Sequence, residues 1–307
     1  MKVSQIIWVV IFATGLAIRS IAQNKIGIGV GTDISSSAQR KESAEKIANY
    51  LANKLGKTVE IIVTDKNTEL VQLFQENKIQ LAFFNTFGYI LAANEVEIEP
   101  LVVIADEAKQ PVSYSSCIIT YPNSAVKTLK ELKELKGKID FLFVNPTSTS
   151  GHLVPRLLFN SIGMDYSETH FNKIEFAGNH LNTIIAIKEK KFEAGACSFD
   201  DLQKAIKNGI LKENEIHILW KSEPIVNGPV AVAKNLDKIQ KEQISKAFLT
   251  MSQEKPELLA DIQKLWHISQ EAKSYDFTPA FEKFYDSVKS MANSMEELIL
   301  IINYYID

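Results

Sequence analysis

Cysteine is scarce in this chain of 307 residues, which contains only Cys117 and Cys197. Two thiols cannot hold a disulfide-stapled scaffold together, and neither stands at a spacing typical of metal ligands. The chain is therefore neither a disulfide-rich small protein nor a cysteine-based metal protein. From the sequence alone it stays open whether the two thiols form a disulfide or remain free.

The sequence also lacks the basic cluster of a nucleic-acid-binding protein. Lys and Arg number 34 against 37 Asp and Glu, which gives a formal net charge of −3 at pH 7. Such a chain has no electrostatic attraction for a phosphate backbone, so we expect no nucleic-acid partner. If the chain binds an anion, a local site must hold it against the overall charge.

Several other classes are excluded by what is missing. Apolar residues make up 46% and charged residues 23% of the chain, as in ordinary soluble globular proteins, so disorder and collagen-like repeats are excluded. No segment after the N-terminus is apolar for long enough to cross a bilayer, and we expect no membrane-embedded part. A Gly-x-Ser-x-Gly elbow, a His-Glu-x-x-His motif and a phosphate-binding loop with its Lys are all missing. The sequence therefore predicts no catalytic residue, no metal ion and no cofactor.

The first 22 residues have the pattern of a secretory signal peptide. Lys2 precedes the apolar stretch Ile6–Ile18, and Ser20-Ile21-Ala22 offers the small residues that signal peptidase recognises. A helix of about 13 residues spans about 20 Å, short of the hydrocarbon core of about 30 Å, so a membrane anchor is the weaker interpretation. No cysteine follows this stretch, and a lipid-anchored N-terminus is not indicated. We expect a cleaved, periplasmic protein.

Strand and helix patterns alternate from Lys25 onward, which is typical of an α/β fold with a mostly parallel sheet covered by helices. The expected strands are Lys25–Val30, Thr58–Val63, Gln80–Phe84, Glu99–Ile104, Tyr114–Tyr121, Ile139–Val144, Lys173–Phe176, Phe192–Cys197, Ile216–Trp220 and Val230–Ala233. The expected helices are Ala38–Leu55, Leu70–Asn77, Thr86–Asn94, Lys127–Leu135, Gly151–Ile162, Leu181–Lys190, Asp200–Asn208 and four helical patterns that end at Ile306.

Two breaks divide this alternation into two units of similar size. The breaks lie near residues 106–113 and 221–229 and are rich in polar residues, Pro, Asn and Gly. We predict one lobe from residues 23–110 and 224–307 and a second from residues 111–223. Two chain crossings would form a hinge between the lobes, and the cleft between them is where such architectures bind small ligands.

The most informative segment follows the expected strand that ends at Val144. Thr147, Ser148, Thr149 and Ser150 come in succession, and Gly151 stands directly behind them at an expected helix start. The first N–H groups of a helix lack intrahelical partners and carry a partial positive charge, so they can hold a phosphate-like group without Lys or Arg. An ordinary N-cap needs only one such residue, and the run of four therefore favours an anion site.

Three further strand-to-helix turns carry polar or aromatic residues. Phe83, Phe84 and Thr86 lie at the first of them, His180 at the second and Asp200 at the third. Alternate aromatic residues of a strand must face the core, and a single His or a helix-start Asp usually serves as a cap or surface residue. These residues are weaker candidates on their own chemistry than the hydroxyl run.

The sequence resembles the periplasmic phosphate, phosphite and phosphonate-binding proteins of ABC transporters. The resemblance covers residues 25–235, and its most specific part is the Ser-Thr-Ser-Gly-x-x-x-Pro element from Ser148 to Pro155. It is carried in order by Ala44–Leu55, Leu81–Ala92, Tyr114–Thr120, Leu129–Gly137, Asn145–Pro155, Phe176–His180, Phe192–Cys197 and Ser222–Val230. The resemblance implies a type II periplasmic-binding-protein fold, in which two α/β lobes joined by a two-crossing hinge close on the ligand.

The resemblance also implies roles for individual residues. In that family the hydroxyl run, here Ser148, Thr149 and Ser150, holds the anion. An aromatic residue at a strand end, matching Phe83 or Phe84, and the His matching His180 also contact it. An acidic residue near Asp200 or Asp201 would face the organic end of the ligand. The residues themselves add Gly151, which lets the backbone come close to the anion, and Thr86 as an extra donor.

This chain departs from the family pattern at three places. Phe stands where phosphonate binders often have Tyr at the strand end, and Ser35, Ser36 and Ser37 replace an aromatic-bearing segment. Gly228 occupies the position of an Asp that meets the ammonium group in binders of aminoalkyl phosphonates. Phosphite, a small alkyl phosphonate or another oxyanion therefore fits the sequence better than an aminoalkyl phosphonate.

We predict a monomeric solute-binding protein that captures a small oxyanion and delivers it to an ABC transporter permease. A ligand-sensing module with the same fold and a membrane receptor as partner is the first alternative. The second is an enzyme on this scaffold, of the kind that makes a pyrimidine precursor, which would need a catalytic Lys or a Cys–His pair in the cleft.

The signal-peptide interpretation predicts that the exported chain begins at Gln23, and removal of Lys2 and Arg19 changes the formal charge from −3 to −5. Intact-mass measurement of the exported protein tests this, with loss of residues 1–22 as the expected result. Recovery of the full chain in the membrane fraction would show that the segment is an anchor.

Overall fold

The computed structural model describes residues 25–31, 37–64, 67–164, 167–265 and 275–291. The predicted signal peptide and the residues Ser35 and Ser36 lie outside these ranges. No helix in the described ranges is long and apolar enough to cross a membrane.

A six-stranded sheet forms the core of the first lobe, in the order β13-β4-β12-β3-β1-β2. Its strands are β1 Lys25–Val30, β2 Thr58–Val63, β3 Leu81–Phe83, β4 Ile98–Ala105, β12 Val230–Ala233 and β13 Asp276–Pro279. β1 pairs in parallel with β2 and β3, whereas β12 is antiparallel to β3 and β4, and β13 is antiparallel to β4. Four of the six strands thus run in one direction, as expected for a mostly parallel sheet.

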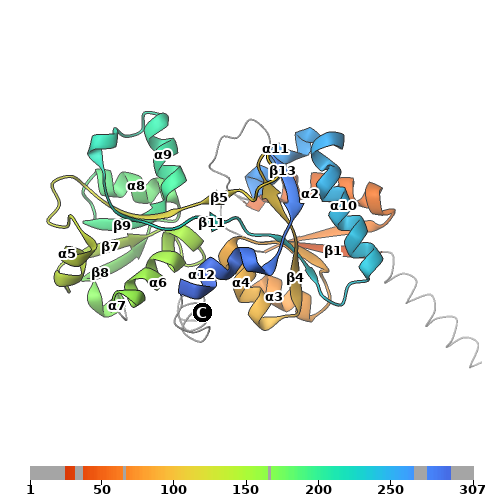
Figure 1. Cartoon of the computed structure of the whole chain (residues 1–307), viewed down its shortest axis with the longest axis horizontal. Helices are drawn as coiled ribbons and strands as arrows, with labels where there is room; N and C mark the ends of the chain where they lie inside the picture. Colours follow the sequence, from red (N-terminus) through yellow and green to blue (C-terminus); the bar gives the residue numbers. More distant parts are fainter. Residues whose placement is uncertain (1–24, 32–36, 65–66, 165–166, 266–274, 292–307) are drawn as a thin grey trace, which may run out of the picture.

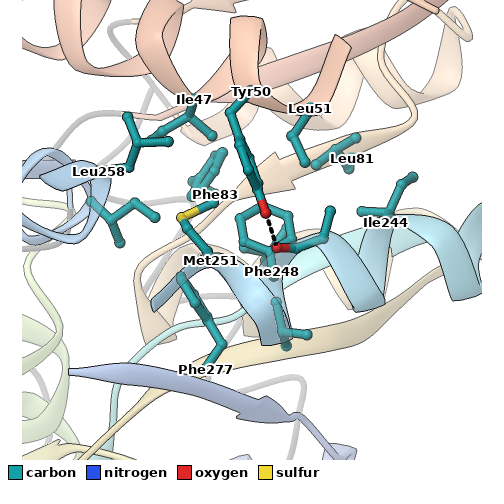
Figure 2. Packing of buried hydrophobic residues seen from close by; sticks show 14 of the residues in the cluster. Ile47, Tyr50, Leu51, Leu81, Phe83, Ile244, Phe248, Met251, Leu258 and Phe277 are labelled. Atoms are coloured by element: carbon teal, nitrogen blue, oxygen red, sulfur yellow. Dashed lines mark hydrogen bonds between the residues drawn. The ribbon is translucent and has the colours of Figure 1, made fainter. Parts of the chain in front are cut away.

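Helices cover both faces of this sheet (Figure 1). They are α2 Ser37–Leu55, α3 Asn67–Gln75, α4 Thr86–Glu95, α10 Lys238–Glu254 and α11 Pro256–Leu265. α2, α10 and α11 pack on one face, where the Tyr50 hydroxyl donates to the Ala247 carbonyl at 2.8 Å (Figure 2). α3 and α4 cover the other face. Because side chains alternate along a strand, neighbouring residues of β3 enter different cores.

The second lobe is built on a five-stranded sheet in the order β10-β6-β9-β7-β8. Its strands are β6 Ser116–Thr120, β7 Asp140–Phe143, β8 Lys173–Phe176, β9 Ala194–Ser198 and β10 His217–Lys221. Its helices are α5 Leu129–Glu134, α6 Val154–Ser161, α7 Ser167–His170, α8 His180–Lys188 and α9 Phe199–Lys207. α5, α6 and α7 pack on one face, and α8 and α9 on the other. The α/β fold of two helix-covered sheets is as predicted.

Two short antiparallel strands connect the lobes. β5 Ser113–Tyr114 pairs with β11 Ile225–Val226, and both lie between the two lobes in Figure 1. The Asn227 side chain strengthens this connection, because its Nδ2 donates to the Val112 carbonyl at 3.1 Å. These strands fall at the two breaks of the sequence pattern and form the expected two-crossing hinge.

The C-terminal region differs from the expected series of helices. Asp276–Pro279 forms the edge strand β13, which is followed by the 3-10 turn η3 Glu282–Tyr285 and by α12 Asp286–Met291. The strand β13 was not predicted, because a strand of four residues is too short to show a clear alternation. The remaining C-terminal helical pattern, residues 292–307, lies outside the described ranges.

α12 also connects the two lobes at a second place. It follows β13 of the first lobe but packs beside α6 of the second lobe (Figure 1). Leu153 and Leu157 of the second lobe share a buried apolar cluster with Tyr285 and Val288, and the Tyr285 hydroxyl donates to the Asn227 carbonyl at 3.2 Å. This apolar interlobe contact, made by residues 285–288, stabilises the arrangement of the lobes.

Replacing Val288 with Ala tests the interlobe contact, with Val232→Ala as a matched control inside the first lobe. Each substitution removes a fully buried pair of methyl groups and should lower the free energy of unfolding by about 2 kcal/mol. Only Val288→Ala should raise the radius of gyration of the native protein, measured by small-angle X-ray scattering. Equal radii for both variants and the parent would show that the contact does not hold the lobes together.

Candidate functional site

Four helices begin where a strand of one of the two sheets ends. The capping side chains are Asn85 for α4, Ser148 for the helix after β7, Asn179 for α8 and Ser198 for α9. Each accepts a hydrogen bond from a first-turn amide, as usual for an N-cap. In α/β proteins ligands bind at the carboxyl ends of the strands, and these four helix starts supply N–H donors there.

The helix after β7 begins earlier than expected. A π-helical turn, η1 Thr149–Leu153, precedes α6, so the helix starts at Thr149 and not at Gly151. Ser148 is its cap and accepts from the Gly151 amide at 3.0 Å, which leaves the hydroxyl hydrogen as its remaining donor. The amides of Thr149 and Ser150 open the helix and have no intrahelical acceptor.

Pro155 explains why this turn is wide. It is the second residue of α6, directly beyond η1, and it has no N–H for the Gly151 carbonyl. The Val144 amide donates to that carbonyl instead at 3.1 Å, and the Ser116 hydroxyl donates to the Ser150 carbonyl at 2.6 Å. π-Helical turns of this kind are frequent at functional sites. Here the turn is bonded to Ser116 of β6 and to Val144, which directly follows β7.

The first lobe contacts this turn directly. The Phe87 amide at the start of α4 donates to the Thr149 hydroxyl oxygen at 3.0 Å, and Asn85 Nδ2 donates to the Thr147 carbonyl at 3.0 Å. The structure thus brings the hydroxyl run of one lobe together with the helix start of the other. Thr86 lies beside them, but its hydroxyl donates to the hinge carbonyl of Val226 at 2.6 Å. Its main contact is therefore with the hinge.

Gly228 lies where two backbone segments nearly touch. A Cβ atom at this position would be 2.0 Å from the Phe84 carbonyl oxygen and 2.7 Å from the Asn85 Cα. Both contacts are with backbone atoms, so no side chain fits without moving the cap of α4. In this chain, position 228 therefore requires glycine.

His180 is the first residue of α8, and its surroundings determine its tautomer. The Ser198 amide donates to Nδ1 at 2.9 Å, so this nitrogen carries no proton. The proton lies on Nε2, which is 4.0 Å from Asp201 Oδ2. Asp200 is held by the Ser115 amide, which donates to its Oδ2 at 3.1 Å. His180 thus presents a neutral N–H donor, next to the acidic start of α9.

Phe83 and Phe84 do not join the hydroxyl run. Phe83 packs edge-on against Phe248 in the core between the sheet and α10, as Figure 2 shows. Phe84 stacks on Phe74 in the opposite core, with ring centres 6.2 Å apart. Both rings are buried, and the hypothesis that one of them contacts the ligand gains no support from their placement.

A buried polar pair next to the site was not found by the sequence analysis. His152 accepts from Arg156 Nε at 2.8 Å through its Nε2, while its Nδ1 donates to the Pro146 carbonyl at 2.9 Å. Burial and the charge of Arg156 lower the pKa of His152 to about 3. The i,i+4 spacing of the two residues was visible in the sequence, but such a spacing alone does not indicate a buried contact.

Cys117 and Cys197 face each other across β6 and β9. Both are fully buried free thiols, with their sulfur atoms 3.5 Å apart. The contact with Cys117 and the burial raise the pKa of Cys197 well above its ordinary value. A protonated, inaccessible thiol is a poor nucleophile, so this pair does not supply the catalytic cysteine that an enzyme would need.

The neutral His152 predicts a specific pH dependence of stability. Its pKa is about 3 in the fold against 6.5 ordinarily, so between these values the unfolded chain binds a proton that the native protein does not. Stability should therefore fall as the pH is lowered from 7 to 4, by about 3 kcal/mol from this group. Urea unfolding of the parent and of His152→Gln at several pH values isolates this contribution. Parallel pH profiles for the two proteins would contradict it.

Comparison with known proteins identifies the family of this chain. The family model of periplasmic substrate-binding proteins of phosphonate ABC transporters matches residues 32–275. The phosphonates-binding periplasmic protein of Escherichia coli K12 is 24% identical over 217 residues, which are 70% of this chain and 62% of that protein. The probable phosphite-binding protein PhnD1 of Prochlorococcus marinus MIT 9301 is 23% identical over 189 residues, which are 59% of this chain and 62% of that protein.

The alignments with these two curated relatives thus span less than two thirds of their length. In three dimensions, the structure of PhnD1 with methylphosphonate superposes with a TM-score of 0.67 at 18% identity, over 89% of this chain and 99% of that one. This likeness confirms the type II periplasmic-binding-protein fold. With the family match over most of its length, the chain belongs to the family of periplasmic substrate-binding proteins of phosphonate ABC transporters.

Proposed function

We propose that this chain binds a small phosphonate-type oxyanion between its lobes in the periplasm and delivers it to an ABC transporter. The observation that carries the proposal is the helix start at Thr149 and Ser150, where two amides without intrahelical acceptors stand beside hydroxyl groups. The Phe87 amide of the other lobe reaches the same point through the Thr149 hydroxyl. A bound oxyanion would thus contact donors of the second lobe, one of which, the Thr149 hydroxyl, is held in place by the first lobe.

The proposed anion site comprises Ser148, Thr149, Ser150 and Gly151, with His180 as an additional donor. None of these groups carries a positive charge, and Arg156 nearby is paired with Glu168 at 2.6 Å. Hydrogen bonds from fixed amides and hydroxyls to charged oxygens are strong enough to bind an anion without a cationic side chain. We infer a binding protein and not an enzyme, because the family binds substrates for transport and because the unprotonated Nδ1 of His180, which a general base would use, already accepts from the Ser198 amide.

The organic end of the ligand is expected to be small and uncharged. Gly228 leaves no room for an acidic side chain that would meet an ammonium group, and Asp200 is engaged with the Ser115 amide. Phosphite and methylphosphonate fit these conditions better than 2-aminoethylphosphonate. The two relatives named for phosphonates and phosphite support this class of ligand.

Removing one hydroxyl of the site should weaken binding markedly. A hydrogen bond to a charged oxygen contributes about 1.5–3 kcal/mol, so Ser150→Ala and Thr149→Ala should each lower the affinity by about 10-fold to 150-fold. Thr149→Ala also removes the contact with Phe87 and should have the larger effect. Isothermal titration calorimetry of the parent with phosphite, methylphosphonate, 2-aminoethylphosphonate, phosphate and methanesulfonate identifies the preferred anion. Titration of each variant with that anion then measures the loss of affinity.

Ser161→Ala is the matched control, because its hydroxyl donates to the Leu158 carbonyl at the far end of α6. It should bind the preferred anion as tightly as the parent. If the parent binds none of the anions, the proposed ligand class is wrong. If both site variants bind as tightly as the parent, the site lies elsewhere.

A further inference from the structure

Arg156 is a buried cation that lies behind the proposed anion site. It is only 3% exposed and belongs to the first turn of α6. Its Nη1 pairs with Glu168 Oε1 at 2.6 Å, its Nε donates to His152 at 2.8 Å, and its guanidinium carbon lies 4.6 Å from the centre of the Phe143 ring. A guanidinium fork held by a carboxylate, an imidazole and an aromatic face has one defined orientation.

His152 connects Arg156 to the turn that carries the site. Its ring stands edge-on to Phe143 and Phe176, with ring centres 4.9 Å and 5.3 Å away. Since Nε2 accepts from Arg156, Nδ1 carries the proton and donates to the Pro146 carbonyl. A continuous chain of contacts therefore runs from Glu168 through Arg156 and His152 to Pro146, two residues before Ser148.

The first part of the turn, residues 146–148, needs such support. Ser150 and Gly151 are bonded to Ser116 and Val144, but within the second lobe this first part makes local bonds: the Thr147 amide and hydroxyl both donate to Asn145 Oδ1 at 3.0 Å, and Ser148 caps η1. Local bonds of this kind move with the turn and do not fix it relative to the sheet. His152 is anchored between rings of β7 and β8, so its bond to Pro146 ties the turn to the sheet.

We propose that Arg156 is a positioning residue for the anion site, acting through His152 on the turn that carries Thr149 and Ser150. It does not touch the ligand. Arg156 fixes the proton of His152 on Nδ1, and the resulting bond to Pro146 holds the turn in its binding geometry before the ligand arrives. Without the His152–Pro146 bond, part of the binding free energy is used to order the turn, and the affinity for the ligand is lower. The inference rests on the proposed function for its effect on affinity, but not for its effect on the turn.

The test uses Arg156→Met, His152→Phe and the double variant in the full mature chain. Methionine keeps the length of the arginine side chain without its donors, and phenylalanine keeps the ring contacts of His152 without its hydrogen bonds. Each single variant should bind methylphosphonate about tenfold more weakly in calorimetric titration. In the unliganded protein, amides 147–151 should exchange with deuterium faster than in the parent. Leu132→Ala, a core substitution of the same lobe, should change neither quantity.

The double variant separates positioning from general loss of stability. If Arg156 acts through His152, the double variant should bind no more than about twofold more weakly than His152→Phe alone. The proposal would be overturned if the affinity loss of the double variant equals the product of the two single losses. It would also be overturned if Arg156→Met shows the affinity and the amide exchange of the parent. If Arg156→Met does not fold, His152→Phe with parent-like exchange at 147–151 overturns it equally. Failure of the parent to bind methylphosphonate counts against the proposed ligand only, since the exchange measurement needs no ligand.

Discussion

The backbone amides that a helix cannot satisfy within itself are the constraint on which the proposed anion site depends. At Thr149 and Ser150 they lie at the end of β7, between two lobes, and are held there by contacts to both. An anion with several oxygens satisfies such amides better than water does, because the donors are already aligned. A chain with a net charge of −3 therefore needs no cationic side chain at the site to select an anion.

Two carbonyl groups of the wide turn lack their usual intrahelical donor and accept hydrogen bonds from residues at the sheet. Pro155 leaves the Gly151 carbonyl without its usual donor, and the Val144 amide takes that place. Ser116 satisfies the Ser150 carbonyl in the same way. The turn is thereby joined to β6 and to the end of β7, so its geometry follows that of the sheet. Preorganisation of this kind is what allows uncharged donors to bind a charged ligand.

The sequence predicted the two sheets and the hydroxyl run because both leave strong local patterns. Alternation, glycine stops and the succession from Thr147 to Ser150 are properties of neighbouring residues. The role of Thr86 at the hinge and the burial of Phe83 and Phe84 depend on contacts between distant segments, which no local pattern contains. The strand β13 was missed for a related reason, since its assignment comes from pairing with β4, far away in the sequence.

The order of the strands has a consequence for how the chain matures. β12, which separates β3 from β4, lies more than a hundred residues after both, whereas all strands of the second sheet come from one continuous segment. The first sheet therefore cannot close until the second lobe has been synthesised, and its edge is added later still by β13. Because contacts between distant segments form slowly, the first lobe stays incomplete while the chain emerges. If the chain is exported unfolded, as the predicted signal peptide implies, this slow closure keeps the first lobe open for longer during translocation.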